Sequence, residues 1–275
     1  MMVKHGFQRK IQYGILVFLG LCFLLPLLWI ILASFDPNAQ QGIKMPATWT
    51  LQNFKDVLGD ESNLRSFGVG LILSGGQAAL VVAVSVLAAY PLSRYEMRFK
   101  KSFLLSILFM TALPITAVMV PVFQMFLFFK MQNSIIATML FLTASSLPYG
   151  IWMMKNFMDS VPIDLEESAW IDGASVWRGL RSIVAPLMLP GIATIAIFTF
   201  SGSWGNFFVP YILLQTPEKL PASVTIYQFF GSHGMVEYGR LAAFSMLYTM
   251  PSVVLYIFSQ RYMSKGFSMG GATKG

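Results

Sequence analysis

Six long apolar runs restrict the fold of this sequence more than any other feature. They lie roughly at residues 11–35, 66–92, 103–129, 134–157, 187–210 and 241–260. A helix of about 20 residues, rising 1.5 Å per residue, crosses a hydrocarbon core of about 30 Å, so each run is long enough to span a membrane. Lipid supplies no partner for an unpaired backbone group, and the runs lack the alternation of barrel strands. They therefore predict an all-α, polytopic membrane protein with six transmembrane helices.

Composition supports this interpretation. Hydrophobic residues make up 56% of the 275 positions and charged residues only 11%, so a water-soluble monomer could not bury the apolar surface. The net charge of +7 comes from short basic clusters between the apolar runs, which favours membrane topology over nucleic-acid binding. The single cysteine, Cys22, excludes a disulfide framework and a cysteine metal site within this chain.

The distribution of lysine and arginine predicts the orientation. Thirteen of the 19 lie in the termini and connections on the N-terminal side, and six lie on the other side, while the 12 acidic residues divide equally. Basic residues are enriched in cytoplasmic connections, so both termini are expected in the cytoplasm. The first apolar run follows a basic segment but has no cleavage pattern behind it, and we expect it to be retained as the first span.

Within the runs, prolines are frequent and charges are scarce. The prolines predict bent helices around a cavity, although curvature in an ordinary helix bundle explains any one of them. They are Pro26, Pro114, Pro121, Pro148, Pro190 and Pro251. No run carries a charged residue near its centre, whereas proton-coupled pumps usually need one. The energy for any transport is therefore expected to come from elsewhere.

The connection between the fourth and fifth runs has coherent local signals for two short helices. Pro162 stops the preceding helix, and Asp164 can cap the next one, with Glu167 at the spacing of a capping box. Gly173 suits the left-handed residue that ends a helix, and Ser175 can cap a second helix. We expect a short helix, a sharp turn and another short helix on the cytoplasmic surface, with Pro186 at the entry to the fifth span.

The same connection resembles the EAA loop of ABC importer permeases. Glu167-Ser-Ala169 is followed after three residues by Gly173, and after nine more by Ile183-Val-Ala-Pro186, which is the spacing of that loop. Ser168 and Ala185 replace an alanine and a leucine of the usual form. The resemblance implies a type I importer permease fold whose cytoplasmic coupling helix docks on an ATPase subunit. The residues implied in coupling are Glu167, Ser168, Ala169, Gly173, Ile183 and Pro186.

A second resemblance concerns span five and the C-terminal end. Ser203-Trp-Gly-Asn-Phe-Phe-Val-Pro-Tyr-Ile-Leu-Leu214, Gln260-Arg-Tyr-Met-Ser-Lys-Gly-Phe267 and the ending Gly271-Ala-Thr-Lys-Gly275 resemble the smaller pore subunit of maltose-type carbohydrate permeases. This likeness implies a prokaryotic plasma-membrane complex with a second permease, two copies of an ATPase and an extracytoplasmic sugar-binding protein. It also implies a carbohydrate substrate, in particular an oligosaccharide.

No phosphate-binding loop of the Gly-x-x-x-x-Gly-Lys-Ser/Thr type occurs in the sequence. We therefore expect no enzyme activity, no metal site and no cofactor on this chain, with ATP and Mg bound by the partner ATPase.

Polar and aromatic residues within the apolar runs are candidates for sugar contacts, because sugars are bound by aromatic faces together with amides and hydroxyls. They are Gln77, Gln124, Tyr149, Trp152, Trp204, Asn206 and Tyr211. A structural role competes with this interpretation, since Trp and Tyr anchor span ends and amides tie helices together.

Other functions remain open at this point. An embedded enzyme would need a catalytic cluster, and the sequence has neither a His-Glu-x-x-His pair nor an intramembrane carboxylate pair. A secondary transporter, a channel, and an importer permease for a phosphoester, peptide or amino acid also compete with carbohydrate import. The expected organisation is an N-terminal helix with an external segment at 1–65, a permease domain at 66–263 containing the coupling loop 161–186, and a cytoplasmic tail at 264–275.

Overall fold

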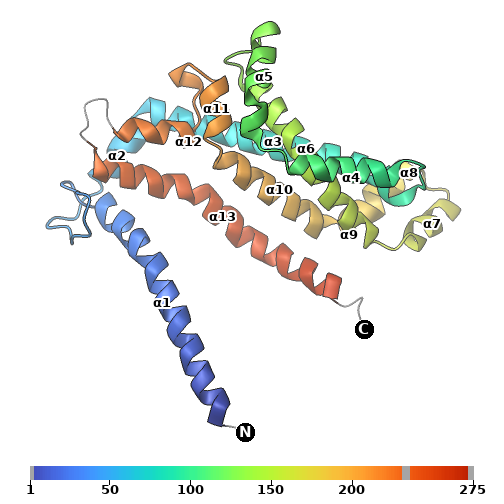
Figure 1. Cartoon of the computed structure of the whole chain (residues 1–275), viewed down its shortest axis with the longest axis horizontal. Helices are drawn as coiled ribbons and strands as arrows, with labels where there is room; N and C mark the ends of the chain where they lie inside the picture. The colour runs from blue at the N-terminus through green and yellow to red at the C-terminus, as the bar shows by residue number, and fades with distance from the viewer. Residues whose placement is uncertain (1–2, 231–235, 272–275) are drawn as a thin grey trace. The chain divides into compact units, whose positions relative to one another are not determined.

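A computed structural model describes the backbone of residues 3–230 and 236–271 and the side chains of residues 9, 11–230 and 236–260. All regular structure in these ranges is helical (Figure 1), which confirms the all-α class. A π-helical stretch lies at Leu180–Val184 and 3-10 turns at Pro217–Lys219 and Ile226–Phe230. The α-helices are α1 Val3–Ser34, α2 Gln52–Gly59, α3 Glu61–Arg94, α4 Lys100–Thr111, α5 Ile115–Phe128, α6 Ile135–Asp159, α7 Asp164–Ile171, α8 Val176–Gly179, α9 Ala185–Leu187, α10 Leu189–Trp204, α11 Phe208–Leu213, α12 Ala222–Thr225 and α13 Tyr238–Gly271.

Four helices in the described ranges, α1, α3, α6 and α13, are each long and apolar enough to cross a membrane. The number rises to six if two bent pairs each count as one span. The third predicted span is divided into α4 and α5, which meet at 93°, and Pro114 lies at their break. The helical run 176–187 and α10 meet at 75°, and Pro190 lies just after that break. The other four prolines named above lie inside helices.

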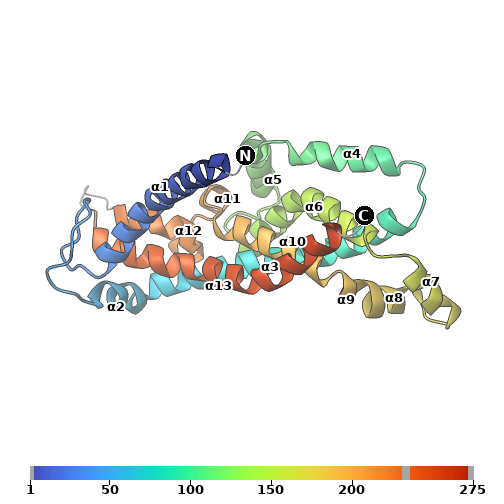
Figure 2. The same ribbon diagram turned by 90° about the horizontal axis from the view of Figure 1, so that it is seen from below.

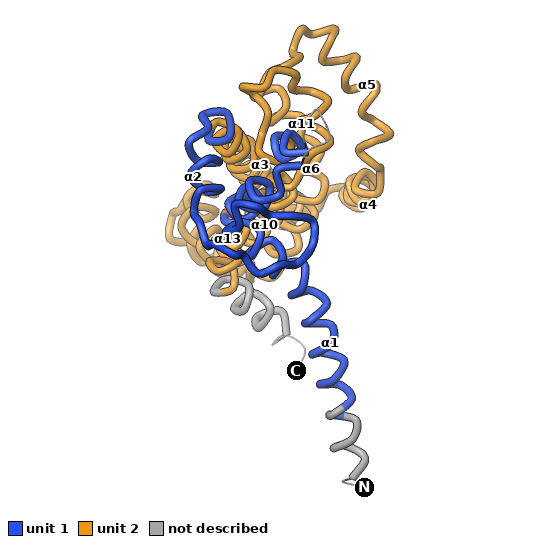
Figure 3. Tube along the Cα trace, turned by 90° about the vertical axis from the view of Figure 1, so that its left-hand side faces the viewer, with its two compact units in different colours: residues 1–64, 225–250 blue, residues 65–224, 251–275 orange. Residues whose placement is uncertain are grey.

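The chain forms two compact units (Figure 3). One unit contains residues 1–64 and 225–250, and the other contains residues 65–224 and 251–275. In the first unit, the buried side chain of Asn53 ties α2 to the segment after α1, because its amide donates to the backbone carbonyls of Ser34 at 3.1 Å and Asp36 at 3.0 Å. A carboxamide that donates two bonds fixes this segment more firmly than apolar contact alone.

The core of the second unit lies where α3, α6 and the 180–195 segment pack together, and α3, α6 and α10 run alongside one another in Figures 1 and 2. Close approach of α6 and α10 depends on Gly191, since a Cβ there would lie 2.4 Å from the ring of Phe157. The buried apolar residues of this core are Val81, Ala89, Tyr90, Met154, Met158, Val161, Leu180, Val184, Met188 and Ile195.

A second cluster in this unit packs α5 and α11 against α6, through Phe126, Val209 and Leu142 among others. The turn between α5 and α6 contains Lys130 and Asn133, with φ of 55° and 57°. The Oδ1 atom of Asn133 accepts hydrogen bonds from the backbone N–H groups of Gln215 and Thr216 and from the Thr216 hydroxyl, at 3.1, 3.2 and 3.1 Å. Asn133 therefore ties this turn to the segment after α11.

Candidate functional site

The predicted coupling loop forms the two helices that its sequence indicates, but its first helix begins differently. The N-cap of α7 is Ile163, which makes no side-chain capping bond, and Asp164 is the first helical residue. The prediction that Asp164 caps the helix is therefore wrong. The carbonyl of Ile163 already accepts from the N–H groups of Glu166 and Glu167, so the first turn closes one residue earlier. The three acidic residues of that turn still oppose the positive end of the helix dipole.

The end of α7 confirms the prediction for Gly173. This residue has a φ of +84°, and its N–H donates to the carbonyl of Trp170 at 3.0 Å. The N–H of Ala174 donates to the carbonyl of Ala169 at 2.9 Å, which completes a Schellman motif. Among the described residues, a Cβ on Gly173 would meet nothing within 4 Å, so the backbone conformation alone requires glycine here.

The second helix begins as predicted and runs further than predicted. Ser175 caps α8, since its hydroxyl accepts from the Arg178 N–H at 3.3 Å. Helical structure then continues through the π-helical stretch and α9, so Pro186 lies inside this run, and the break to α10 falls at Met188. In an α-helix, a proline ring clashes with the carbonyl four residues before it. The π-helical stretch, whose turn is wider, lies just before Pro186.

The residues implied in coupling divide into an exposed and a half-buried group. Ala169 and Ile183 are half-buried, while Glu167, Ser168, Gly173 and Pro186 are exposed. Large apolar side chains accompany the exposed group, because Ile171 is 86% exposed and Trp177 is 61% exposed. Exposed apolar residues beside acidic ones are typical of a protein interaction surface. The loop therefore presents a surface suited to a partner protein.

A buried charged residue that sequence reasoning missed lies on the inner face of α7. Glu166 is fully buried, and its two carboxylate oxygens accept from Arg94 Nε at 2.5 Å and from the Tyr90 hydroxyl at 2.9 Å. Arg94 also donates to the carbonyl of Val161 at 3.1 Å. The sequence offered two signals, a basic residue at the end of one apolar run and two adjacent glutamates in the loop. It did not show that Arg94 pairs with Glu166, because the two residues are 72 apart in sequence.

Three of the seven predicted sugar contacts serve helix packing. The Gln77 amide donates to the Leu142 carbonyl at 3.0 Å and to the Ser146 hydroxyl at 2.8 Å, so it ties α3 to α6. Trp204 is buried and stacks on Phe200 with ring centroids 6.0 Å apart. Asn206 accepts from the Val209 N–H at 3.1 Å and thereby closes the start of α11.

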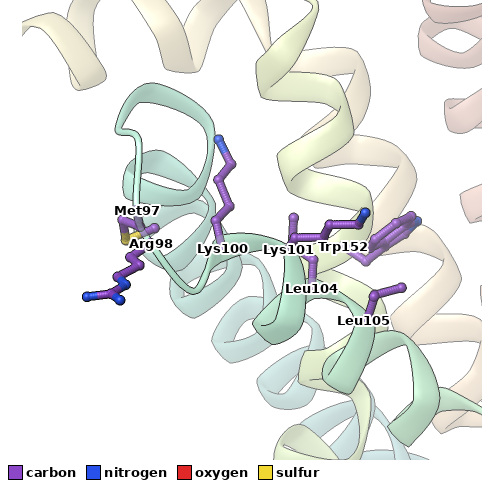
Figure 4. Close-up of a pocket in the computed structure, with 7 residues that line it drawn as sticks. All are labelled: Met97, Arg98, Lys100, Lys101, Leu104, Leu105 and Trp152. Carbon is purple, nitrogen blue, oxygen red and sulfur yellow. The ribbon is translucent and has the colours of Figure 1, made fainter.

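The other four predicted contacts are more accessible. Gln124, Tyr149 and Tyr211 are exposed, and Tyr211 stacks on Phe207 at a centroid distance of 4.9 Å. Trp152 lines a cavity of about 430 Å³, and none of the other six candidates lines this cavity. In Figure 4 the side chain of Lys101 points toward Trp152. The cavity is lined by Met97, Arg98, Lys100, Lys101, Leu104, Leu105 and Trp152. The structure thus does not bring the seven candidates into one cavity.

The first unit contains a separate polar cavity of about 310 Å³. Asp56 and Arg240 form an ion pair at 3.0 Å on its wall, with side chains 26% and 44% exposed. The hydrogen bond from Gln52 lowers the pKa of Asp56, and the bond from Arg240 lowers it further. Within the described residues, no group of three or more histidine, cysteine, aspartate or glutamate side chains could hold a metal ion.

Comparisons with known proteins place this geometry among transport proteins. Residues 81–268 match the family described as binding-protein-dependent transport system inner membrane component. The chain is 30% identical to the sulfoquinovosyl glycerol transport system permease protein of Agrobacterium fabrum, over 96% of this chain and 92% of that one. It is 28% identical to the galactooligosaccharides transport system permease protein of Bacillus subtilis, over 100% and 99% of the two chains. The fold matches a chain of a bacterial ABC transporter involved in the import of the acidic polysaccharide alginate, with a TM-score of 0.81, 21% identity, and coverage of 92% and 95%.

Proposed function

The chain belongs to the family of binding-protein-dependent transport system inner membrane components, and from this premise we propose that residues 161–186 are the loop through which it engages a separate ATPase subunit. It is a membrane-embedded permease of an ABC importer and not an enzyme, because ATP hydrolysis in these importers belongs to a separate subunit. The coupling assignment is carried by one observation, the left-handed turn at Gly173, which presents the exposed face of the loop.

The exposed face is suited to a protein partner in shape and in chemistry. At the Schellman turn the chain reverses with no side chain at its tip, so a partner surface can approach the backbone closely. Glu167 offers a charge for a basic group, and Ile171 and Trp177 offer apolar area that is otherwise left to water.

A pair of substitutions at Gly173 tests this proposal. Gly173→Ala adds only a Cβ, which meets no atom of the described residues within 4 Å, so the ATPase should be retained. Gly173→Asp adds a larger, charged side chain at the partner surface, so ATPase association should weaken and transport should be lost, with the permease still inserted. Glu167→Lys should act in the same direction but more mildly. Retention of ATPase on purified membranes together with normal uptake in Gly173→Asp would refute the proposal.

For the substrate, we propose an uncharged or weakly charged carbohydrate, in particular an oligosaccharide. The relatives named above transport galactooligosaccharides and sulfoquinovosyl glycerol, and another relative, 29% identical, is a maltodextrin permease of Bacillus subtilis. The spans carry no charged residue near their centres to complement an ionic solute. Uptake by the reconstituted complex should be supported by an oligosaccharide, whereas strict dependence on an amino acid or a metal ion would contradict the proposal.

Among the seven candidate sugar contacts, the exposed Tyr211, Tyr149 and Gln124 are proposed to touch substrate directly. Gln77, Trp204 and Asn206 are proposed to shape the path by holding helices in place, and Trp152 to line it near α4. Tyr211→Ala should reduce uptake with little change in the amount of complex. Gln77→Ala should reduce that amount, because it leaves the Ser146 hydroxyl and the Leu142 carbonyl without this donor.

The remaining assembly is also proposed by resemblance and charge. It comprises a second homologous permease, an ATPase homodimer that binds ATP and Mg, and an extracytoplasmic binding protein, with both termini of this chain in the cytoplasm of a prokaryote. No cofactor is assigned to this chain. In a Cys22→Ala background, cysteines at Asp60 and Glu218 should be labelled from outside and a cysteine at Lys100 from inside. The opposite pattern would overturn the orientation.

A further inference from the structure

We propose that Glu166 is a positioning residue that sets the placement of the coupling loop. With Tyr90 and Arg94 it forms a buried polar cluster, called the α3–α7 latch below, which ties α7 to the end of α3. This inference rests on the proposed function, since it assigns a role to the inner side of the loop whose outer side is proposed to meet the ATPase.

The latch uses both carboxylate oxygens of Glu166. One accepts from Arg94 Nε at 2.5 Å and the other from the Tyr90 hydroxyl at 2.9 Å. The Arg94 and Glu166 side chains are 5% and 0% exposed, so water does not compete for these bonds. A carboxylate held at both oxygens by two residues of one helix cannot rotate freely, and the latch therefore fixes the orientation of α7 as well as its distance from α3.

Little else of α7 is buried. Glu166 is its only fully buried residue; Ala169 and Trp170 are half-buried, and Leu165 and Ile171 are 44% and 86% exposed. An attachment through apolar packing would be tolerant of small displacements, because apolar contact has no direction. The charged attachment is directional, and breaking it would leave an uncompensated charge in a buried place. The polar geometry at Glu166 therefore adds a directional constraint to the partial packing of α7.

At the other end, the latch holds a helix that is well embedded in the second unit. Val81, Ala89 and Tyr90 of α3 belong to the apolar core formed with α6 and the 180–195 segment. Gln77 on the same helix ties α3 to α6. A force applied to α7 is thus passed to α3 at Arg94 and Tyr90, in addition to the covalent routes through α6 and α8.

The test compares variants in the complete reconstituted importer, with its ATPase and binding protein. Glu166→Gln keeps the size of the side chain and removes the charge. The matched control is Asp159→Asn, because Asp159 also bonds the end of α3, through the Ser93 hydroxyl at 2.7 Å, but from an exposed position. Three quantities are measured: the amount of ATPase retained, substrate transported per ATP hydrolysed, and stimulation of ATP hydrolysis by substrate-loaded binding protein.

We expect Glu166→Gln to retain ATPase, because the exposed face of the loop is unchanged. Transport per ATP should fall about tenfold or more, since removing one charge of a buried ion pair destabilises the attachment of α7 to α3 by at least that factor. Tyr90→Phe removes a single hydrogen bond and should lower the same ratio by a smaller factor. Asp159→Asn should leave the ratio unchanged.

The outcomes separate the latch from the proposed function. If Glu166→Gln leaves transport per ATP and its stimulation unchanged, the latch has no positioning role. If Glu166→Gln does not accumulate in the membrane, transport per ATP in Tyr90→Phe tests the positioning role instead. Should these variants lower only the amount of complex, with the ratio intact, the cluster is merely structural and the inference is overturned. Failure of the proposed function would appear instead as undiminished ATPase retention and uptake in Gly173→Asp.

Discussion

Two helices of the second unit end in the same hydrogen-bond motif with different residues. In α7 the left-handed position is Gly173, with a φ of +84°, and in α5 it is Lys130, with a φ of +55°. At Lys130 the N–H donates to the Leu127 carbonyl at 3.1 Å, and the next N–H donates to the Phe126 carbonyl at 2.8 Å. This Schellman pattern matches the one at Gly173. A side chain with a Cβ costs about 1–2 kcal/mol in this conformation, so one end is strained and the other is not.

The strained end is held by additional bonds, which the relaxed end lacks. Three residues after Lys130, Asn133 accepts three hydrogen bonds from Gln215 and Thr216 and donates its N–H to the Leu213 carbonyl at 2.9 Å. These bonds over-determine the turn, so the conformation at Lys130 persists despite its cost. At Gly173, no atom in the described part of the chain lies within 4 Å of the position that a Cβ would occupy. The geometry of this turn depends on the helix-end hydrogen bonds and on the conformational freedom of glycine. Such a turn leaves the tip accessible to the partner proposed above.

The largest expected stability change that sharpens this comparison is at Asn133. Asn133→Ala removes all three side-chain bonds and places an alanine at a φ of 57°, so it should destabilise the protein by about 2–4 kcal/mol. Thermal unfolding of the purified complex would measure the loss. Asn133→Asp keeps the accepting oxygen and should change stability much less. An equal loss in both variants would show that the hydrogen bonds do not hold the strained turn.

A smaller effect is expected at the relaxed end. Gly173→Ala should destabilise the chain by about 1 kcal/mol, because the only penalty is the Cβ in a left-handed conformation. The same unfolding measurement applies, with Ala174→Gly as a control next to the turn. If Gly173→Ala cost as much as Asn133→Ala, the tip would have to contact something that its surroundings do not show, and the contrast between the two ends would disappear.

The smallest expected effect has the opposite sign. Lys130→Gly should relieve the strained end of α5 and raise the free energy of unfolding by up to about 1 kcal/mol, reduced by the greater flexibility of glycine in the unfolded chain. A higher apparent melting temperature would confirm it. A lower one would indicate that the exposed lysine side chain stabilises this turn by more than its backbone costs.

Local signals account for the parts of the fold that the sequence predicts. The apolar runs predict α1, α3, α6 and α13, because a span needs only length and composition. Gly173 and Ser175 are confirmed as helix stop and start, since a left-handed turn and a side-chain cap are decided by neighbouring residues. The cap at Asp164 is wrong because Ile163, next to Pro162, takes the cap position and closes the turn first. Composition shows no break in the third apolar run, and Pro114 predicts a bend there but not its size, which is 93° in the structure.

In the candidate site, too, features set by neighbouring residues could be predicted, and features set by residues distant in sequence could not. The exposed coupling residues belong to a short motif whose positions lie close together in the sequence. Glu166 could not be distinguished from Glu167 by such reasoning, because its burial depends on Arg94 and Tyr90, which lie in another span. Gln77 and Trp204 show the converse case: polar and aromatic residues in apolar runs look alike in sequence, and only packing shows which of them hold helices together.

The buried pair of Arg94 and Glu166 also has a consequence for the order in which the chain matures at the ribosome. The two residues are 72 positions apart, so at about 5–20 residues per second the arginine emerges roughly 4–15 s before its carboxylate. Throughout that interval, Arg94 at the end of α3 is charged and its carboxylate partner has not yet been synthesised. Burying an unpaired charge is unfavourable, so we expect Arg94 to stay in water until Glu166 has been synthesised. Packing of α7 against the end of α3 is then expected to follow synthesis of the coupling loop.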